Sequence, residues 1–247
     1  MEFDQDMTGT LYGIGLGPGD PDLMTLKAHR LISSARVIAY PAPDTGPSFA
    51  RSIAARFIPE GAREIPIIVP MRVDRFPARE IYNKAAVEIA ATLENGEDVI
   101  TLCEGDPFFY GSFMYLYERL SERFACEVVP GVTSLTACAA QLRRPLTART
   151  DVMTVIPGPL PDGEIREKVE AAQAVAIMKV GRHVKRLKAL LADMGLLEHA
   201  GYVERASLPE QQVHRLADVT SETAPYFSMI LIYKGDEAWT LPPSFSS

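Results

Sequence analysis

Short apolar segments alternate with segments of helical spacing through the first half of this chain, and this order constrains the fold more than any other feature. The segments that predict strands are residues 10–17, 37–40, 64–69, 98–106 and 126–131. Between them, apolar residues recur at helical spacing, as at Ile81, Ala85 and Ile89. Strands that alternate with helices favour a mainly parallel sheet with helices on both faces.

The pattern changes after Gly131. Four prolines between Pro145 and Pro161 predict a loose stretch, and further strands are predicted over residues 174–180, 200–207 and 227–235. A helix is predicted over residues 183–195, where a glycine ends it. We therefore predict two α/β domains, residues 8–129 and residues 130–247.

Glycine occupies every second position from Gly13 to Gly19 in "GIGLGPGDPD", directly after the first predicted strand. A dinucleotide-binding loop requires G-x-G-x-x-G, and here Asp20 stands where the third glycine would be. Its negative charge would repel a pyrophosphate. We expect Asp20 to cap a helical turn that Pro21 begins, a role that does not exclude a contact with substrate.

A second Gly-Asp-Pro follows another predicted strand, in "CEGDPFFYG". The carboxyl ends of parallel strands lie at one edge of a sheet, so the two loops are expected to open on the same side. Gly105 would allow a ligand to approach the backbone closely. The aromatic run from Phe108 to Tyr110 either walls a flat ligand or belongs to the core.

The amino-acid composition limits the kinds of molecule that this chain can bind. A net charge of -7 weighs against a general nucleic-acid binder, which usually carries excess Lys and Arg. Neither an apolar leader nor an apolar run of membrane-spanning length is visible, so we expect a cytoplasmic protein without a membrane partner. The three cysteines lack CxxC spacing and the four histidines lack ligand spacing, which predicts free thiols and no metal site.

Three motifs together resemble the tetrapyrrole methyltransferases of cobalamin and sirohaem synthesis. They are "GLGPGDPDLMTLKA", "EGDPFFYGS" and "VVPGVTSLTACAA", which begin at Gly15, Glu104 and Val128. The resemblance implies two α/β domains with a cleft between them, the tetrapyrrole methylase fold, and not the Rossmann-like methyltransferase fold. It also implies a homodimer and S-adenosylmethionine (SAM) as methyl donor, held mainly by main-chain groups.

The resemblance also assigns site residues. The residues it assigns to SAM are Gly105, Asp106, Pro107, Tyr110, Thr133, Ser134, Met178 and Ala206. The Gly17, Pro18 and Gly19 loop is expected to face the tetrapyrrole. Since the implied substrate is a polycarboxylate, arginines are candidates for binding it, although any single one could be a solvated surface residue. The arginines we predict are Arg75, Arg79 and Arg144, with Arg72, Arg143 and Arg149 as further candidates.

Within the family, the chain looks most like the branch that methylates meso carbon C20 of precorrin-2 to give precorrin-3A. The methylated carbon must then lose a proton, and Asp20 and Glu104 are candidates to accept it. Three alternatives stay open: C20 methylation of cobalt-factor II in the anaerobic route, another branch of the fold acting on uroporphyrinogen III, rRNA or a diphthamide precursor, and a module that binds tetrapyrroles without catalysis.

Overall fold

The computed structural model describes residues 8–70, 78–239 and 241. The chain divides into two compact units, one ending at Thr133 and the other beginning at Ser134. Each unit contains its own five-stranded sheet. The domains predicted as residues 8–129 and 130–247 stay a prediction.

The first unit is built on a parallel sheet, as the alternating pattern predicted. Its strands lie in the order β3-β2-β4-β1-β5, and every pairing between neighbours is parallel. Their bounds are β1 Leu11–Gly15, β2 Val37–Ala42, β3 Arg63–Ile68, β4 Val99–Cys103 and β5 Cys126–Val129. Pro66 lies in β3, an edge strand, where a missing main-chain N–H is tolerated.

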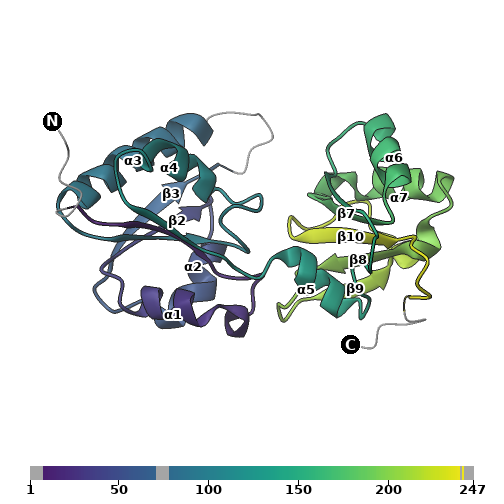
Figure 1. Ribbon diagram of the computed structural model, residues 1–247, viewed down its shortest axis with the longest axis horizontal. Helices are drawn as coiled ribbons and strands as arrows, with labels where there is room; N and C mark the ends of the chain where they lie inside the picture. Colours follow the sequence, from purple (N-terminus) through teal and green to yellow (C-terminus); the bar gives the residue numbers. More distant parts are fainter. Residues whose placement is uncertain (1–7, 71–77, 240, 242–247) are drawn as a thin grey trace. The chain divides into compact units, whose positions relative to one another are not determined.

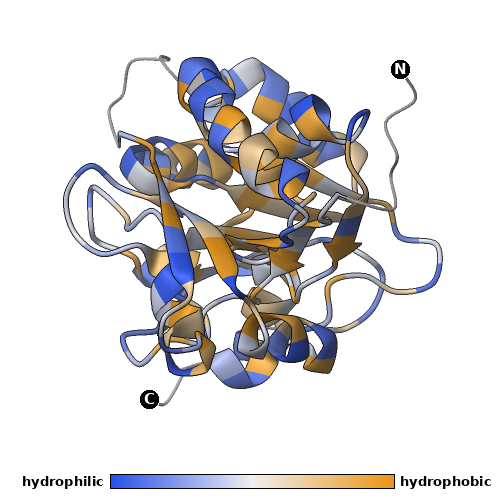
Figure 2. Ribbon diagram, turned by 90° about the vertical axis from the view of Figure 1, so that its left-hand side faces the viewer, coloured by the Kyte–Doolittle hydropathy of each residue, from blue (hydrophilic) through white to orange (hydrophobic). Residues whose placement is uncertain are grey.

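Helices cover both faces of this sheet (Figure 1). One face packs against α1 (Leu26–Ser33) and α2 (Phe49–Ala54), and the other against α3 (Ala78–Glu94) and α4 (Phe113–Leu120). The strands are mainly hydrophobic, whereas each helix carries both hydrophobic and hydrophilic residues (Figure 2). The sheet is thus buried on both faces, which explains the continuous apolar runs in the sequence.

The alternating glycines of β1 serve close packing. Gly13 and Gly15 point to the same face of the strand, because successive residues alternate between faces. A Cβ atom on Gly13 would collide with the ring of Phe113 in α4, and one on Gly15 would collide with the main chain of Gly131. Glycine at these positions lets a helix and a neighbouring loop approach the strand.

The second unit has a mixed sheet in the order β6-β7-β10-β8-β9. Strands β6 and β7 pair in parallel, whereas β10 is antiparallel to β7 and β8, and β9 is antiparallel to β8. The bounds are β6 Met153–Pro157, β7 Ala174–Met178, β8 Ala200–Glu204, β9 Gln212–Arg215 and β10 Ser228–Tyr233. The mainly parallel sheet was predicted from the first half of the chain, and the mixed pairing of this second sheet was not predicted.

Helix α5 (Ser134–Gln141) packs on one face of the mixed sheet, and α6 (Asp162–Ala171) and α7 (Val184–Asp193) pack on the other. The loose stretch predicted between Pro145 and Pro161 was wrong, since it contains β6. This strand lies at a sheet edge and reaches its last residue at Pro157, so the proline interrupts no central ladder. Single 3-10 turns are η2 Pro21–Leu23, η3 Ala55–Phe57, η4 Gly181–His183, η5 Leu197–His199 and η6 Leu216–Asp218.

Candidate functional site

The two Gly-Asp-Pro loops are joined directly by main-chain hydrogen bonds. Gly105 N–H donates to the Gly17 carbonyl over 2.8 Å, and Gly17 N–H donates back to the Gly105 carbonyl over 3.2 Å. The preceding strands, β1 and β4, are parallel neighbours. The prediction that both loops open at one edge of the sheet is confirmed, and each loop fixes the position of the other.

Gly105 has the backbone geometry of a ligand-binding glycine. Its φ of 63° lies in the left-handed region, which residues other than glycine rarely adopt. A Cβ atom at this position would meet nothing within 4 Å. By contrast, a Cβ atom on Gly15 or Gly131 would overlap other main-chain atoms. The open face of Gly105 therefore lies beside a tightly packed glycine junction.

The Asp106 carboxylate organises the second loop. Its Oδ1 accepts hydrogen bonds from the N–H groups of Phe108 and Phe109, over 2.9 and 3.1 Å. Its Oδ2 accepts a hydrogen bond from Gly131 N–H over 3.1 Å. The side chain thus ties the second motif to the third, so a contact of Asp106 with SAM would fall to its main chain.

The remaining residues of this loop differ in exposure. Pro107 is buried, whereas Tyr110 is 44% exposed, has a φ of 58° and packs edge-on against Phe109. Phe108 is 49% exposed. The aromatic run is therefore mainly outside the core, as the first of the two interpretations requires. Thr133 and Ser134, from the third motif, are half-buried.

Asp20 caps a helical turn as predicted. It precedes the 3-10 turn η2, and its carboxylate accepts a hydrogen bond from Asp22 N–H over 2.9 Å. Pro18 is half-buried and Gly19 is buried in the same loop. The main-chain polar groups of Gly17 are engaged with Gly105, so this residue supports the loop.

The other carboxylate predicted to accept a proton, Glu104, is half-buried. Burial raises the pKa of Glu104, and hydrogen bonds from its own main chain and from that of Ala50 oppose the shift. A raised pKa suits a group that must take up a proton near neutral pH. Glu104 directly follows β4, at the end of the strand from which the second Gly-Asp-Pro loop begins.

In the second unit, the predicted SAM residues Met178 and Ala206 also lie where strands end. Met178 is the last residue of β7, and Ala206 lies two residues after β8 ends. Both pack in one apolar cluster with Ala137 and Cys138 of α5. The structure thus places these two predicted SAM residues at neighbouring loops of a single sheet edge.

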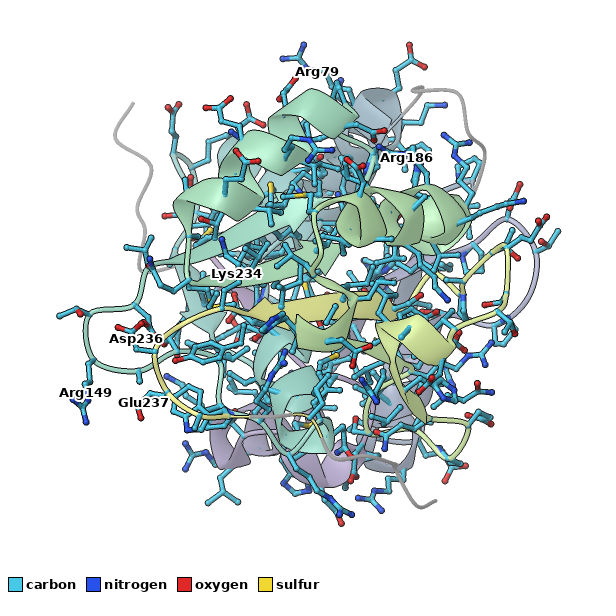
Figure 3. All side chains as sticks on the ribbon, turned by 90° about the vertical axis from the view of Figure 1, so that its right-hand side faces the viewer. Arg79, Arg149, Arg186, Lys234, Asp236 and Glu237 are labelled. Carbon is cyan, nitrogen blue, oxygen red and sulfur yellow. The ribbon has the colours of Figure 1, made fainter. Side chains whose placement is uncertain are left out.

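The predicted arginines fall into different environments. Arg75 and Arg72 lie outside the described residues. Arg79 is exposed on α3 (Figure 3). Arg144 is only 5% exposed and donates to the carbonyls of His199 and Leu231 over 2.8 and 2.9 Å, while burial lowers its pKa to about 10. These contacts give Arg144 a structural role in place of the expected contact with substrate.

Arg143 and Arg149 have φ values of 52° and 44°, and the Arg149 side chain pairs with Glu237 over 3.1 Å at the surface (Figure 3). Among the residues that the structure describes, no cluster of His, Cys, Asp and Glu could hold a metal ion. Over the same ranges, none of the helices has the length and apolar character to cross a membrane.

Sequence comparison finds relatives over most of the chain. This chain is 41% identical over 235 residues to the cobalamin biosynthesis protein CobIJ of Mycobacterium tuberculosis. The alignment covers 92% of this chain but only 46% of CobIJ. The chain is 36% identical to a precorrin-2 C(20)-methyltransferase of Sinorhizobium sp, over 91% of this chain and 95% of the relative. A cobalt-precorrin-2 C(20)-methyltransferase of Salmonella typhimurium is 35% identical, over 92% and 98%.

Solved structures share the fold. Cobalt precorrin-4 methyltransferase CbiF aligns with a TM-score of 0.68 at 26% identity, over 91% of this chain and 94% of that one. Uroporphyrin-III C-methyltransferase of Thermus thermophilus, complexed with S-adenosyl homocysteine, aligns with a TM-score of 0.65 at 26% identity, over 90% and 97%. The model of the tetrapyrrole (corrin/porphyrin) methylases matches residues 10–219. With two joined glycine loops at one sheet edge and this match, the chain belongs to the tetrapyrrole (corrin/porphyrin) methylase family.

Proposed function

We propose that this protein transfers a methyl group from SAM to meso carbon C20 of precorrin-2, giving precorrin-3A in corrin biosynthesis. The observation that carries the proposal is the similarity to the Sinorhizobium precorrin-2 C(20)-methyltransferase over nearly the full length of both chains. The chain spans about half of CobIJ, so that protein's similarity supports the pathway but not the individual reaction.

The residues of the loops suit the methyl donor. SAM supplies an electrophilic methyl group on a sulfonium, and main-chain groups with an apolar wall suit its charge and its adenine. In the first unit, the proposed contacts are the main chains of Gly105, Asp106 and Pro107, with Tyr110 and Thr133. The open face of Gly105 supports this assignment, since it leaves room for a ligand against the backbone. In the second unit, the proposed contacts with SAM are Ser134, Met178 and Ala206.

Methyl transfer to carbon mainly requires alignment of the two reacting atoms and exclusion of water. The chain meets the first requirement by fixing its loops: Asp106 anchors the second motif to the third, and Gly17 holds Gly105. We propose that the first loop, Gly17 to Gly19, faces the tetrapyrrole. Glu104 and Asp20 stay the proposed acceptors of the proton that C20 loses, and Arg75 and Arg79 stay proposed substrate contacts.

The test is a methylation assay with precorrin-2 and SAM that carries a carbon-13 methyl group. The expected product is heavier by one labelled methyl group, and its carbon-13 resonance correlates with the meso position. Label on a pyrrole carbon would reject the C20 assignment. A protein that neither transfers methyl nor binds SAM in calorimetric titration would be a tetrapyrrole-binding module instead.

A second substrate form has support from the Salmonella relative, which is named for cobalt-precorrin-2. Parallel initial rates with metal-free and cobalt-loaded substrate distinguish the two. We expect faster turnover of the metal-free form, because the sequence offers no evident axial ligand for cobalt. A higher kcat/KM for the cobalt form would assign the chain to the anaerobic route.

We also propose that the protein acts as a cytoplasmic homodimer, without nucleic-acid or membrane partners, and that its domains are residues 8–129 and 130–247. The family resemblance and the acidic composition support these proposals. Light scattering coupled to size exclusion would measure the oligomer directly, and salt-sensitive binding of RNA would contradict the absence of a nucleic-acid partner.

A further inference from the structure

Two cationic residues follow parallel strands at one edge of the second sheet. Strand β10 runs antiparallel to both β7 and β8, so β7 and β8 run in the same direction and end at the same edge. Lys179 follows the last residue of β7, and Arg205 follows the last residue of β8. The two cations therefore begin neighbouring loops beside Met178 and Ala206.

Both cations lie in a backbone conformation that favours glycine. The φ values are 55° for Lys179, 47° for Arg205 and 69° for Ser207. Residues other than glycine keep such geometry where the surrounding fold imposes it, and ligand sites are enriched in it. The residues next in the chain, Val180 and Ala206, are buried, so each cation directly precedes a residue that packs in an apolar cluster.

The cations themselves stay accessible. Lys179 is exposed and Arg205 is half-buried. Strand β10 lies between β7 and β8: Ile230 pairs with Ile177 of β7, and Ser228 pairs with Glu204 of β8. The two loops therefore begin on either side of β10. Two strand spacings separate their backbones by about 10 Å, a distance that acidic groups on a single macrocycle can bridge.

No internal carboxylate satisfies Arg205 among the described residues. The adjacent Glu204 is only 8% exposed, and its Oε1 accepts a hydrogen bond from the Tyr202 hydroxyl over 2.6 Å. The Arg205 main-chain N–H donates to the Phe227 carbonyl over 2.7 Å, which fixes the loop without using the guanidinium. A half-buried guanidinium without an ion pair retains its forked donors for an external anion.

We propose that Lys179 and Arg205 bind carboxylate side chains of the tetrapyrrole substrate. This inference rests on the proposed function and adds substrate contacts that the motif resemblance did not assign. Arg205 supplies a planar fork for one carboxylate, and Lys179 supplies a point charge for another. Because the protein is acidic overall, such local cations have to attract a polyanionic substrate.

The test measures equilibrium binding of uroporphyrin, an octacarboxylic macrocycle, to the full chain by fluorescence. The variants are Lys179→Gln and Arg205→Gln, which remove the charge and keep a shorter polar side chain, and Arg205→Lys, which keeps the charge. The matched control is Arg166→Gln. Arg166 is half-buried, like Arg205, but lies in helix α6 and pairs with Asp193 over 2.5 Å.

Each glutamine variant is expected to weaken uroporphyrin binding at least fivefold, and the control less than twofold. Arg205→Lys should recover part of the loss. A cationic porphyrin without carboxylates should bind no more weakly to the variants, and SAM affinity by calorimetry should stay within twofold. Circular dichroism and the Tm confirm that each variant is folded.

Equal uroporphyrin affinities for the glutamine variants and the Arg166 control would overturn the proposal. A loss confined to SAM affinity would also overturn it and would assign the cations to the carboxylate of SAM. The proposed function fails differently: the wild-type protein would then transfer no methyl group to precorrin-2, while the porphyrin titrations could still show the expected pattern.

Discussion

Gly131 donates its main-chain N–H to the Asp106 carboxylate over 3.1 Å, and this bond joins two segments that are 25 residues apart. The same carboxylate holds the N–H groups of Phe108 and Phe109. The loop proposed to hold SAM is therefore fixed by its own side chain before any ligand binds. Preorganisation of this kind lowers the entropy that binding must overcome.

Removing the Asp106 carboxylate should weaken SAM binding. Asp106→Ala leaves three main-chain N–H groups without their acceptor, so we expect a loss of about 1–3 kcal/mol in unfolding free energy and at least tenfold in SAM affinity. Urea denaturation and calorimetry measure the two effects. The matched control is Asp98→Ala, which removes an acceptor from Thr10 N–H at the amino end of the same sheet. Equal SAM affinities in the two variants would contradict the assignment of the loop.

The glycine junction predicts two different outcomes for the same substitution. Gly131→Ala places a methyl group against the Gly105 carbonyl and should destabilise the protein by about 1–3 kcal/mol. Gly105→Ala meets no atom but requires a left-handed alanine, at a cost of about 1–2 kcal/mol, and should weaken SAM binding by filling the open face. Thermal and urea unfolding with SAM titration separate these effects.

Gly163→Ala is the control for this series. Gly163 lies in α6, and a Cβ atom there would meet nothing within 4 Å. Alanine favours a helix over glycine by about 1 kcal/mol, so this variant should be as stable as the wild type or more stable. Comparable destabilisation in all three variants would show that packing at the junction is not the cause.

Asp20 provides a test of the first loop. Asp20→Ala should lower kcat/KM for the tetrapyrrole about tenfold and leave SAM affinity unchanged, if this loop faces the substrate. Asp20→Asn keeps a side-chain oxygen that can cap η2, because Asn caps as well as Asp does. Full activity in the Asn variant would assign the effect to the cap, and lost activity would assign it to the negative charge. Loss of SAM binding alone would mean that the loop contacts the other ligand.

The ion pair between Arg51 and Glu64 predicts a stability that depends on pH. Arg51 donates from Nε and Nη2 to both Glu64 oxygens, over 2.6 and 2.7 Å, and these bonds lower the pKa of Glu64 to about 2. Because the pKa is lower in the folded chain than the ordinary 4.5, the stabilisation is present above pH 4.5 and declines as the pH falls toward 2.

Glu64→Gln should therefore cost about 1 kcal/mol at pH 7, a modest value because both side chains are partly solvated. The difference from wild type should shrink as the pH falls below 4. Urea midpoints at pH 7 and pH 3 measure it, with Glu60→Gln as the exposed control. A difference that stays constant between the two pH values would contradict the role of the ionised pair.

The first sheet was predictable because its inner strands β1, β2 and β4 are mainly buried, so each appears as an apolar run between helices. The second sheet was less predictable from the sequence. Edge strand β9 is a short polar segment, and the bounds of β6 were hidden by neighbouring prolines. Edge strands expose one side to solvent, and their sequences need not carry a continuous apolar signal.

The candidate site also has features that the sequence predicts and features that depend on tertiary packing. By itself, the sequence determined the two Gly-Asp-Pro loops, their common edge and the cap at Asp20, because these depend on local backbone chemistry and on strand direction. Only the tertiary structure decided that Gly15, Gly105 and Gly131 meet, that Arg144 is buried, and that Lys179 and Arg205 begin neighbouring loops. These relationships depend on which distant segments pack together, and no local pattern records that packing.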